Sequence, residues 1–227
     1  ILYGTCTVWP HEVRNLAIDI GGSGLKASVV DQAGQMTTQP QSDSPGSSVV
    51  LGSSKFHRSR GQSTPVIAIL NSHRVAEFDL GSALAELLGV PTKVVNDADM
   101  QGCAVVQGQD LEFVMTLGTG VGTALFNEGR LFPHLELSHG PFHRGETADV
   151  ALGNSAWQAV GNERWTKRVR RSIVISGEML RFDHLYVGGG NAKHLSAGDV
   201  GPKGRLILNS AGILGGVRIW DLPTEDS

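Results

Sequence analysis

Residues 16–30 read LAIDIGGSGLKASVV and decide the fold, because a glycine-rich turn separates two apolar runs of strand length. The pattern predicts a β-hairpin. Glycine adopts positive φ angles readily and has no side chain, so the backbone N–H groups of such a turn can converge on an anion. A serine hydroxyl and a lysine ammonium add to this potential. The candidate phosphate ligands are therefore Gly21, Gly22, Ser23, Gly24 and Lys26.

Asp19 ends the first strand of this hairpin, beside the candidate anion site. A carboxylate there would repel a phosphate unless a divalent cation lay between the two groups. The placement of Asp19 therefore favours a metal-bound phosphate, with the cation held near this carboxylate through water. A glycine hairpin taken alone is more often a plain structural turn, so the binding interpretation needs a second copy of the motif.

A second copy is present at residues 113–126, which read FVMTLGTGVGTALF. Aligning Gly118 on Gly21 also aligns Thr116 on Asp19. Two such hairpins in one chain predict two similar lobes that face each other across a cleft. A dinucleotide site is disfavoured, because GTGVG lacks the G-x-G-x-x-G spacing and is followed by a strand where that site needs a helix.

The paired hairpins resemble the phosphate motifs of the sugar kinase, actin and hexokinase superfamily, and residues discussed below narrow the resemblance to the ROK family of sugar kinases and, within it, to polyphosphate glucokinases. The resemblance implies an α/β fold of two ribonuclease-H-like lobes, the actin-like ATPase fold, with a central cleft and a remodelled or incomplete first lobe. The lobes are expected at residues 1–110 and 111–227. It also implies that the terminal phosphates of ATP or polyphosphate, with Mg²⁺ near Asp19, are bound by Gly118, Thr119 and Gly120.

A candidate catalytic base follows the apolar strand predicted at residues 92–95, which runs directly into Asn96 and Asp97. A carboxylate at the carboxyl end of a strand lies where open α/β sheets bind ligands. Asp97 could accept the proton of a sugar hydroxyl as that oxygen attacks phosphorus, while Asn96 could donate to and accept from sugar hydroxyls. The alternative is helix capping, because Asp and Asn are favoured N-caps, and Asp99 fits the cap better.

Further residues match the sugar-binding motifs of the ROK family in the same order along the chain. The stretch HLELSHGPF matches a Glu-x-Gly-His motif whose acid and imidazole bind hexose hydroxyls, although Ser138 replaces the glycine. Asn71 resembles a sugar-contacting asparagine, and the alternative is a residue that simply ends the strand predicted at Val66–Leu70. The expected sugar ligands are Asn71, Asn96, Glu136 and His139.

A third glycine cluster follows a strand predicted at residues 183–187. A strand, glycines and a helix N-terminus together form an anion site. In the ROK family the corresponding glycines lie against the phosphoryl donor, and close packing at a strand-to-helix turn is the structural alternative. These glycines are Gly188, Gly189 and Gly190.

A helix is predicted at Leu80–Leu88 from the spacing of its apolar residues, and another begins near residue 157. In the second helix, Trp165, Val169 and Ile173 form one apolar stripe, and arginine and lysine occupy much of the remaining surface. We interpret that surface as a solvated basic face, and the alternative is a track for a long anion such as polyphosphate.

The composition limits the classes of protein to consider. The net charge of −3 gives no general attraction to nucleic acid, and no apolar run is long enough to span a membrane. The start of the chain lacks the pattern of a secretion signal, so a cytoplasmic location is expected. Cys6 and Cys103 are too few for the cysteine-rich zinc site of many ROK proteins, so no zinc site is expected. A homodimer is compatible with these features.

The sequence therefore predicts a phosphotransferase that moves a phosphoryl group from ATP or polyphosphate to a hexose hydroxyl, with glucose as the first choice of acceptor. Three alternatives stay open: a sugar-binding ROK-like protein without catalysis, a kinase of mannose, fructose or an amino sugar, and a ROK-type repressor. The repressor is disfavoured because no helix-turn-helix pattern precedes the first hairpin.

Overall fold

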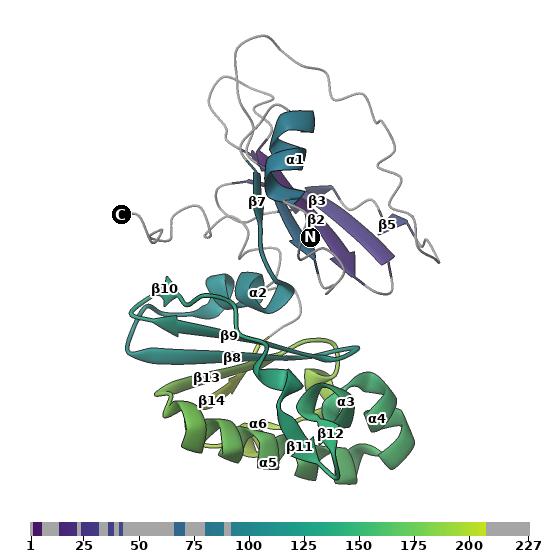
Figure 1. The fold of residues 1–227 in the computed structure, drawn as a ribbon, viewed down its shortest axis with the longest axis vertical. Coiled ribbons are helices and arrows are strands. Elements are labelled where there is room, and N and C mark those ends of the chain that lie inside the picture. Colours follow the sequence, from purple (N-terminus) through teal and green to yellow (C-terminus); the bar gives the residue numbers. More distant parts are fainter. Residues whose placement is uncertain are drawn as a thin grey trace. The chain divides into compact units, whose positions relative to one another are not determined.

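The computed structural model divides the chain into two compact units, Ile1–Val95 (unit 1) and Asn96–Ser227 (unit 2), and each is described by itself. Figure 1 shows the ribbon coloured along the chain. The residues that the structure describes are 2–5, 14–21, 24–31, 36–38, 41–42, 66–70, 80–88 and 92–207.

The boundary between the units differs from the one expected at residue 110. Helix α2 (Asp97–Val105) belongs to unit 2 because it packs on two strands of that unit. Gly102 makes the close approach possible, since a Cβ at this position would overlap the ring of Phe126 and lie 3.2 Å from Val114. The candidate base Asp97 therefore lies in the same unit as the second glycine hairpin.

Unit 1 is built on a seven-stranded mixed sheet with the strand order β4-β3-β2-β1-β6-β7, and β5 pairs with β3. Strands β2, β6 and β7 run parallel, while β2 and β3 are antiparallel. Helix α1 (Leu80–Leu88) lies where the apolar spacing predicts it. The strands are β1 (Leu2–Thr5), β2 (Arg14–Gly21), β3 (Gly24–Asp31), β4 (Met36–Thr38), β5 (Gln41–Ser42), β6 (Val66–Leu70) and β7 (Thr92–Val94).

The first predicted hairpin is confirmed by the pairing of β2 with β3, which begins at Arg14 and Asp31 and closes at Gly21 opposite Gly24. Two residues connect this last pair, which is the loop length of a tight hairpin turn. The flanking strands are rich in isoleucine, valine and alanine, and β-branched residues suit a pleated sheet.

Unit 2 contains a five-stranded sheet with the order β10-β9-β8-β13-β14. Its central hairpin pairs β8 (Leu111–Leu117) with β9 (Val121–Asn127) in antiparallel register, which confirms the second predicted hairpin. Strands β8, β13 and β14 are parallel. The other strands are β10 (Arg130–Leu131), β13 (His184–Gly188), β14 (Gly204–Leu206) and a separate pair, β11 (Pro141–His143) with β12 (Glu146–Thr147).

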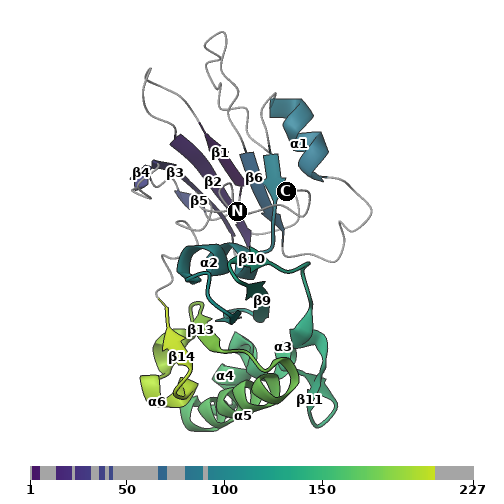
Figure 2. The ribbon, with the colours of Figure 1, turned by 90° about the vertical axis from the view of Figure 1, so that its left-hand side faces the viewer.

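Helices cover both faces of the unit 2 sheet. In the views of Figures 1 and 2, α2 lies on one face and α5 on the other. The helix predicted from residue 157 begins earlier, at Asn154, and is divided by Gly161, which has φ +77°. The helices and 3-10 turns after α2 are η2 (Leu137–His139), α3 (Ala148–Leu152), α4 (Asn154–Val160), α5 (Asn162–Leu180), η3 (Ala192–His194) and α6 (Ala197–Val200).

The core of unit 2 lies between this sheet and α5. Trp165 and Val169 are fully buried, as the apolar stripe predicts, and Ile173 packs at the edge of the same cluster. The indole nitrogen of Trp165 donates a hydrogen bond to the carbonyl oxygen of Leu152 at 2.8 Å, so the polar atom of this large side chain is satisfied. Within the described ranges, no helix has the length and apolar character needed to cross a membrane.

Candidate active site

The turn of the second hairpin, residues 118–120, is closed by a hydrogen bond from the amide of Gly118 to the carbonyl oxygen of Gly120 at 2.9 Å. A carboxylate fixes one side of this turn. Asp149, near the start of α3, accepts a hydrogen bond from the amide of Val121 at 2.7 Å. The close contact requires glycine at position 120, since a Cβ there would overlap the Asp149 carboxyl group.

Two asparagines hold the other side of the turn through the same carbonyl group. The backbone amide of Asn154 donates to the carbonyl oxygen of Gly118 at 2.9 Å, and the side-chain amide of Asn191 donates to it at 3.1 Å. A Cβ at Gly153 would lie 2.5 Å from the carbonyl oxygen of Thr119, so the backbone there must also approach closely. Two segments distant in sequence from the turn, residues 149–154 and the region of Asn191, therefore fix it.

The third glycine cluster lies against the same hairpin. Gly189 has φ +87°, and a Cβ on it would overlap the backbone of Leu117, so close packing explains this glycine. The helix N-terminus expected directly after the cluster is wrong, because the short 3-10 turn η3 follows there instead of an α-helix. Gly188 and Gly190 flank Gly189, and a Cβ at Gly190 would meet no atom within 4 Å in the described part of the chain.

Asp97 is the first residue of α2 and lies next to the second hairpin. A Cβ built on Gly122 of β9 would be 3.4 Å from Oδ1 of Asp97 and 2.5 Å from Oγ1 of Thr116. Thr116 is the residue that aligns with Asp19 of the first hairpin. The structure thus brings the candidate base to the strands that flank the turn, beside a glycine that leaves room for its carboxylate.

Three side chains hydrogen-bond the first turn of α2, those of Asn96, Asp99 and Asp97, whose Oδ1 also accepts a hydrogen bond from the amide of Ala98 at 2.8 Å. The cap expected at Asp99 is on Asn96, whose Oδ1 accepts a hydrogen bond from the amide of Ala98 at 2.8 Å. Asp99 is the third residue of the helix, and its carboxyl group hydrogen-bonds the backbone of Asn96. Asn96 therefore has a structural role in addition to the sugar contact predicted for it.

Glu136 and His139 are brought together by η2, which begins directly after Glu136. His139 Nε2 lies 3.8 Å from Glu136 Oε2, and both side chains are substantially exposed. Ser138, between them, is buried and is not among the described residues with positive φ, so serine adopts this backbone without strain. Its hydroxyl has no hydrogen-bond partner among the described residues.

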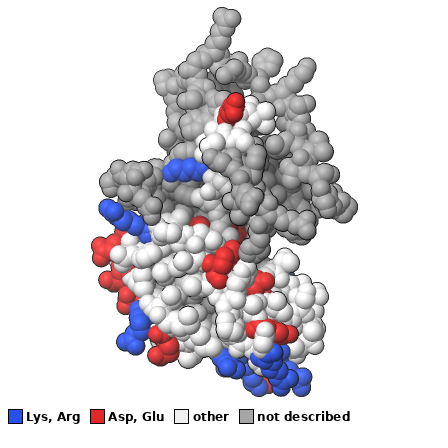
Figure 3. Space-filling model, in the orientation of Figure 1, with Lys and Arg blue, Asp and Glu red and all other residues white. Residues whose placement is uncertain are grey.

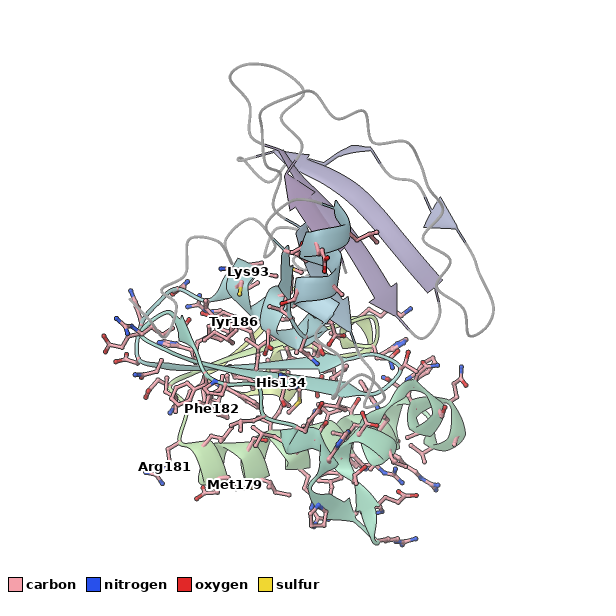
Figure 4. All side chains as sticks on the ribbon, turned by 45° about the horizontal axis from the view of Figure 1, so that its top comes forward. Lys93, His134, Met179, Arg181, Phe182 and Tyr186 are labelled. Carbon is pink, nitrogen blue, oxygen red and sulfur yellow. The ribbon has the colours of Figure 1, made fainter. Side chains whose placement is uncertain are left out.

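His134 was not predicted, yet it is the residue that connects this pair to α2. Its Nδ1 lies 3.1 Å from Asp99 Oδ2, and its Nε2 lies 3.4 Å from Glu136 Oε1. The hydrogen bond with Asp99 is the main cause that raises the pKa of His134 to about 8. Burial raises the pKa of Asp99, and His134 opposes that rise. Figure 4 labels His134 in unit 2.

The basic residues of α5 mostly contact other parts of unit 2. Arg170 Nε donates to Asp199 at 2.8 Å, Arg168 donates to the carbonyl oxygen of Ala151 at 3.1 Å, and Arg171 lies over the ring of Phe142. Figure 3 shows basic side chains gathered at the lower end of unit 2 with acidic ones among them. These contacts favour the solvated basic face over a continuous anion track.

The predicted residues of unit 1 are placed only in part. Asp19 and Gly21 lie in β2, and Gly24 and Lys26 lie in β3. Positions 22, 23 and 71, predicted to bind phosphate and sugar, are outside the described residues. The roles assigned to all these residues stay predictions.

Comparisons with known proteins bear on both sequence and fold. No protein-family model matches the chain. It is 26% identical over 208 residues to the polyphosphate glucokinase of Mycobacterium tuberculosis strain H37Rv, covering 78% of this chain and 77% of that protein. It is also 29% identical over 143 residues to an N-acetylmannosamine kinase of Escherichia coli O1:K1, covering 52% of this chain and 49% of that one.

Among solved structures, the inorganic polyphosphate/ATP-glucomannokinase of Arthrobacter sp. strain KM matches with a TM-score of 0.67 at 24% identity, covering 90% of this chain and 96% of that one. A ROK family glucokinase of Streptomyces griseus, solved in complex with glucose and AMPPNP, matches with a TM-score of 0.60 at 17% identity, covering 90% and 98%. The predicted resemblance to ROK sugar kinases and polyphosphate glucokinases is confirmed, and the fold is the α/β fold of actin-like ATPases.

Proposed function

We propose that this chain is a sugar kinase that transfers a phosphoryl group from ATP or polyphosphate to a hexose hydroxyl, with the 6-hydroxyl of glucose as the preferred acceptor. One observation carries the proposal: the Asp97 carboxylate lies beside Gly122 of β9, the strand that follows the glycine turn. That turn is held by hydrogen bonds with residues 149–154 and with Asn191. A base next to a rigid turn is the arrangement that phosphoryl transfer to an alcohol requires, because this reaction depends on positioning and charge neutralisation.

The turn is suited to bind donor phosphates. The bonds that fix it use the carbonyl oxygens of Gly118 and Thr119 and the amide of Val121. Among the described residues, no hydrogen bond uses the amides of Thr119 or Gly120 as donors. Those amides can therefore donate to phosphate oxygens without breaking the turn. Gly188 and Gly190, which flank the glycine packed on Leu117, are the proposed further contacts of the donor.

The acceptor sugar is proposed to bind through Asn96, Glu136 and His139. Glu136, directly before η2, supplies an acid, and His139, the last residue of η2, supplies an imidazole. Asn96 uses its Oδ1 to cap α2, so its side-chain amide is the group proposed to contact the sugar. Asp97 accepts the proton of the reacting hydroxyl, which would accelerate the transfer about 10²- to 10⁴-fold.

Mg²⁺ fits the proposed site as a cation bound largely through the donor. Mg²⁺ is commonly held by one or two carboxylates together with substrate phosphates. The described residues contain no group of three His, Cys, Asp or Glu side chains that could enclose a metal ion. Asp19 is the proposed ligand, through water, and Gly21, Gly24 and Lys26 are the proposed phosphate contacts of the first hairpin. When bound, the ion would neutralise phosphate charge during transfer.

A second acceptor has specific support. The similarity to an N-acetylmannosamine kinase reaches 29% identity over its aligned segment, so an N-acylated amino sugar is the alternative substrate class. Mannose is the next candidate, because the structurally similar Arthrobacter protein is a glucomannokinase. A cytoplasmic location and a homodimer remain predictions.

A matrix assay tests the proposal. Purified protein is incubated with Mg²⁺, either ATP or polyphosphate, and glucose, mannose, fructose or N-acetylmannosamine, and sugar phosphate is measured by mass spectrometry. We expect glucose 6-phosphate with at least one donor. Asp110→Asn is the matched control for the Asp97→Asn variant. Asp110 is exposed and has φ +54°, a conformation that asparagine tolerates. Hexose binding without any sugar phosphate would instead select a binding protein.

A further inference from the structure

Residues 132–137, called the clamp segment below, lead from β10 into the first residue of η2 and include Glu136. Two contacts fix this segment to unit 2. Thr123 Oγ1 of β9 donates a hydrogen bond to the carbonyl oxygen of Leu135 at 2.9 Å. Nδ1 of His134 approaches both carboxylate oxygens of Asp99, at 3.1 Å and 3.3 Å. The first contact fixes the backbone, and the second fixes a side chain.

Asp99 connects the clamp segment to the first turn of α2. Its side chain is 6% exposed, and its carboxyl group also hydrogen-bonds the backbone of Asn96. Asp97, the proposed base, lies two positions earlier in the same turn. One buried carboxylate therefore holds both the backbone that precedes the base and the segment that carries the sugar clamp.

His134 lies between two carboxylates of different exposure. Asp99 is buried, whereas the side chain of Glu136 is 46% exposed, and His134 itself is 29% exposed. The two ring nitrogens face the two partners separately, Nδ1 toward Asp99 and Nε2 toward Glu136. An imidazole can donate from both nitrogens only when it is protonated.

We propose that His134 and Asp99 are positioning residues for the sugar site, in which protonated His134, anchored on Asp99, holds the Glu136 carboxylate in the orientation that binds the hexose. The inference rests on the proposed function, because it assigns a role to Glu136 in sugar binding. If it is correct, the affinity for the hexose depends on the protonation state of His134.

The direction of the pH dependence follows from the groups around His134. Asp99 faces it from α2, Glu136 faces it from the clamp segment, and His139 of η2 lies 3.8 Å from Glu136 Oε2. The pKa of His134 is raised from the ordinary 6.5 to about 8, mainly by its hydrogen bond with Asp99. Neutral His134 has one N–H, and we expect it to stay on Asp99, because water can replace the donor at the half-exposed Glu136 but not at the buried Asp99. Above about pH 8 the contact with Glu136 is therefore lost first.

The His134→Asn variant separates the two contacts. An asparagine amide takes the place of Nδ1 and can still donate to Asp99, but nothing replaces Nε2 opposite Glu136. We expect KM for glucose to rise ~3- to 10-fold at neutral pH, with kcat changed less than ~2-fold, the effect of losing one charged contact. The wild-type KM should rise by a similar factor between about pH 7 and about pH 9, and this rise should be absent in the variant.

His184→Asn is the matched control, since His184 begins β13, at the opposite end of that strand from Gly188. It should keep the wild-type pH profile of KM. An unchanged KM in His134→Asn at neutral pH, or an alkaline rise of KM that persists in this variant, would overturn the proposal.

A measurement on the unmodified protein tests the inference without any turnover. The Cε1 proton of His134 is followed by NMR as a function of pH. The Asp99→Asn variant tests whether Asp99 is the group that raises the pKa of His134. The wild-type resonance should titrate near pH 8 and return toward 6.5 in Asp99→Asn, with faster amide exchange in residues 132–137. Titration near 6.5 in the wild type would refute the inference. Titration of His134 near pH 8 in a protein that binds no hexose would instead refute the proposed function.

Discussion

Replacing Asp149 by alanine should loosen the second glycine turn and destabilise unit 2. The carboxylate accepts a hydrogen bond from the amide of Val121 at 2.7 Å, and Val121 is buried. A hydrogen bond to a charged group contributes about 1.5–3 kcal/mol, and an amide left buried without a partner is unfavourable by a similar amount. Asp149 also lies in the first turn of α3, where a carboxylate contributes about 0.3–1 kcal/mol.

These terms overlap, so we expect Asp149→Ala to lower the free energy of unfolding by about 2–3 kcal/mol. Asp149→Asn keeps an acceptor oxygen in place and should lower it by about 1 kcal/mol or less. Urea denaturation followed by circular dichroism measures both. Because the turn is proposed to bind the donor, Asp149→Ala should also raise KM for the phosphoryl donor more than KM for glucose.

The comparison between the two variants makes this prediction specific. If Asp149→Ala unfolds within about 0.5 kcal/mol of the wild type, the carboxylate does not fix the turn. If both variants lose the same stability, the hydrogen bond to Val121 is not the cause of the loss. If donor KM stays unchanged in a destabilised Asp149→Ala, the turn is structural and does not bind the donor.

Three further predictions use other polar groups of unit 2. Glu112 is fully buried and accepts hydrogen bonds from the amides of residues 107–109 and the hydroxyl of Tyr186, so Glu112→Gln should lower the free energy of unfolding by about 3 kcal/mol in urea titrations; a loss below about 1 kcal/mol would contradict this. Ser138→Ala removes a buried hydroxyl that has no partner among the described residues and should raise the free energy of unfolding by about 1 kcal/mol. A decrease in this free energy would instead show that the Ser138 hydroxyl makes a hydrogen bond. The pKa of His134 is raised to about 8, so protonated His134 stabilises the fold by about 1 kcal/mol after solvent screening. This stabilisation is fully present below pH 6.5 and is lost as the pH rises through 8. Thermal unfolding at both ends of this range measures the loss, and an equal loss in His134→Asn would contradict the assignment to His134.

The parts of the fold that the sequence predicts are those set by local chemistry. Both hairpins, helix α1 and the junction of β7 with α2 follow from glycine turns and apolar spacing within short segments. The exact division of the chain could not be predicted, because it depends on how closely Gly102 lets α2 approach Phe126. The helix expected after Gly190 is wrong for a similar reason, since the chain there packs against the second hairpin.

The candidate site was predicted by residue type but not by its supporting contacts. Asp149 and Val121 are 28 positions apart, His134 and Asp99 are 35 apart, and Asn191 and Gly118 are 73 apart. Periodicity and turn chemistry describe only neighbours in sequence, so they contain no signal for such pairs. The motif His-x-Glu at His134 is a weak pointer, because its partner Asp99 lies on another element.

Asp97 is proposed to remove the proton of a hexose hydroxyl next to the turn at residues 118–120. The most direct measurement compares Asp97→Asn with the wild type in glucose binding by calorimetry and in single-turnover phosphorylation. We expect an unchanged Kd for glucose and a rate of transfer that falls about 10²- to 10⁴-fold. Equal rates of transfer in the two proteins would contradict it.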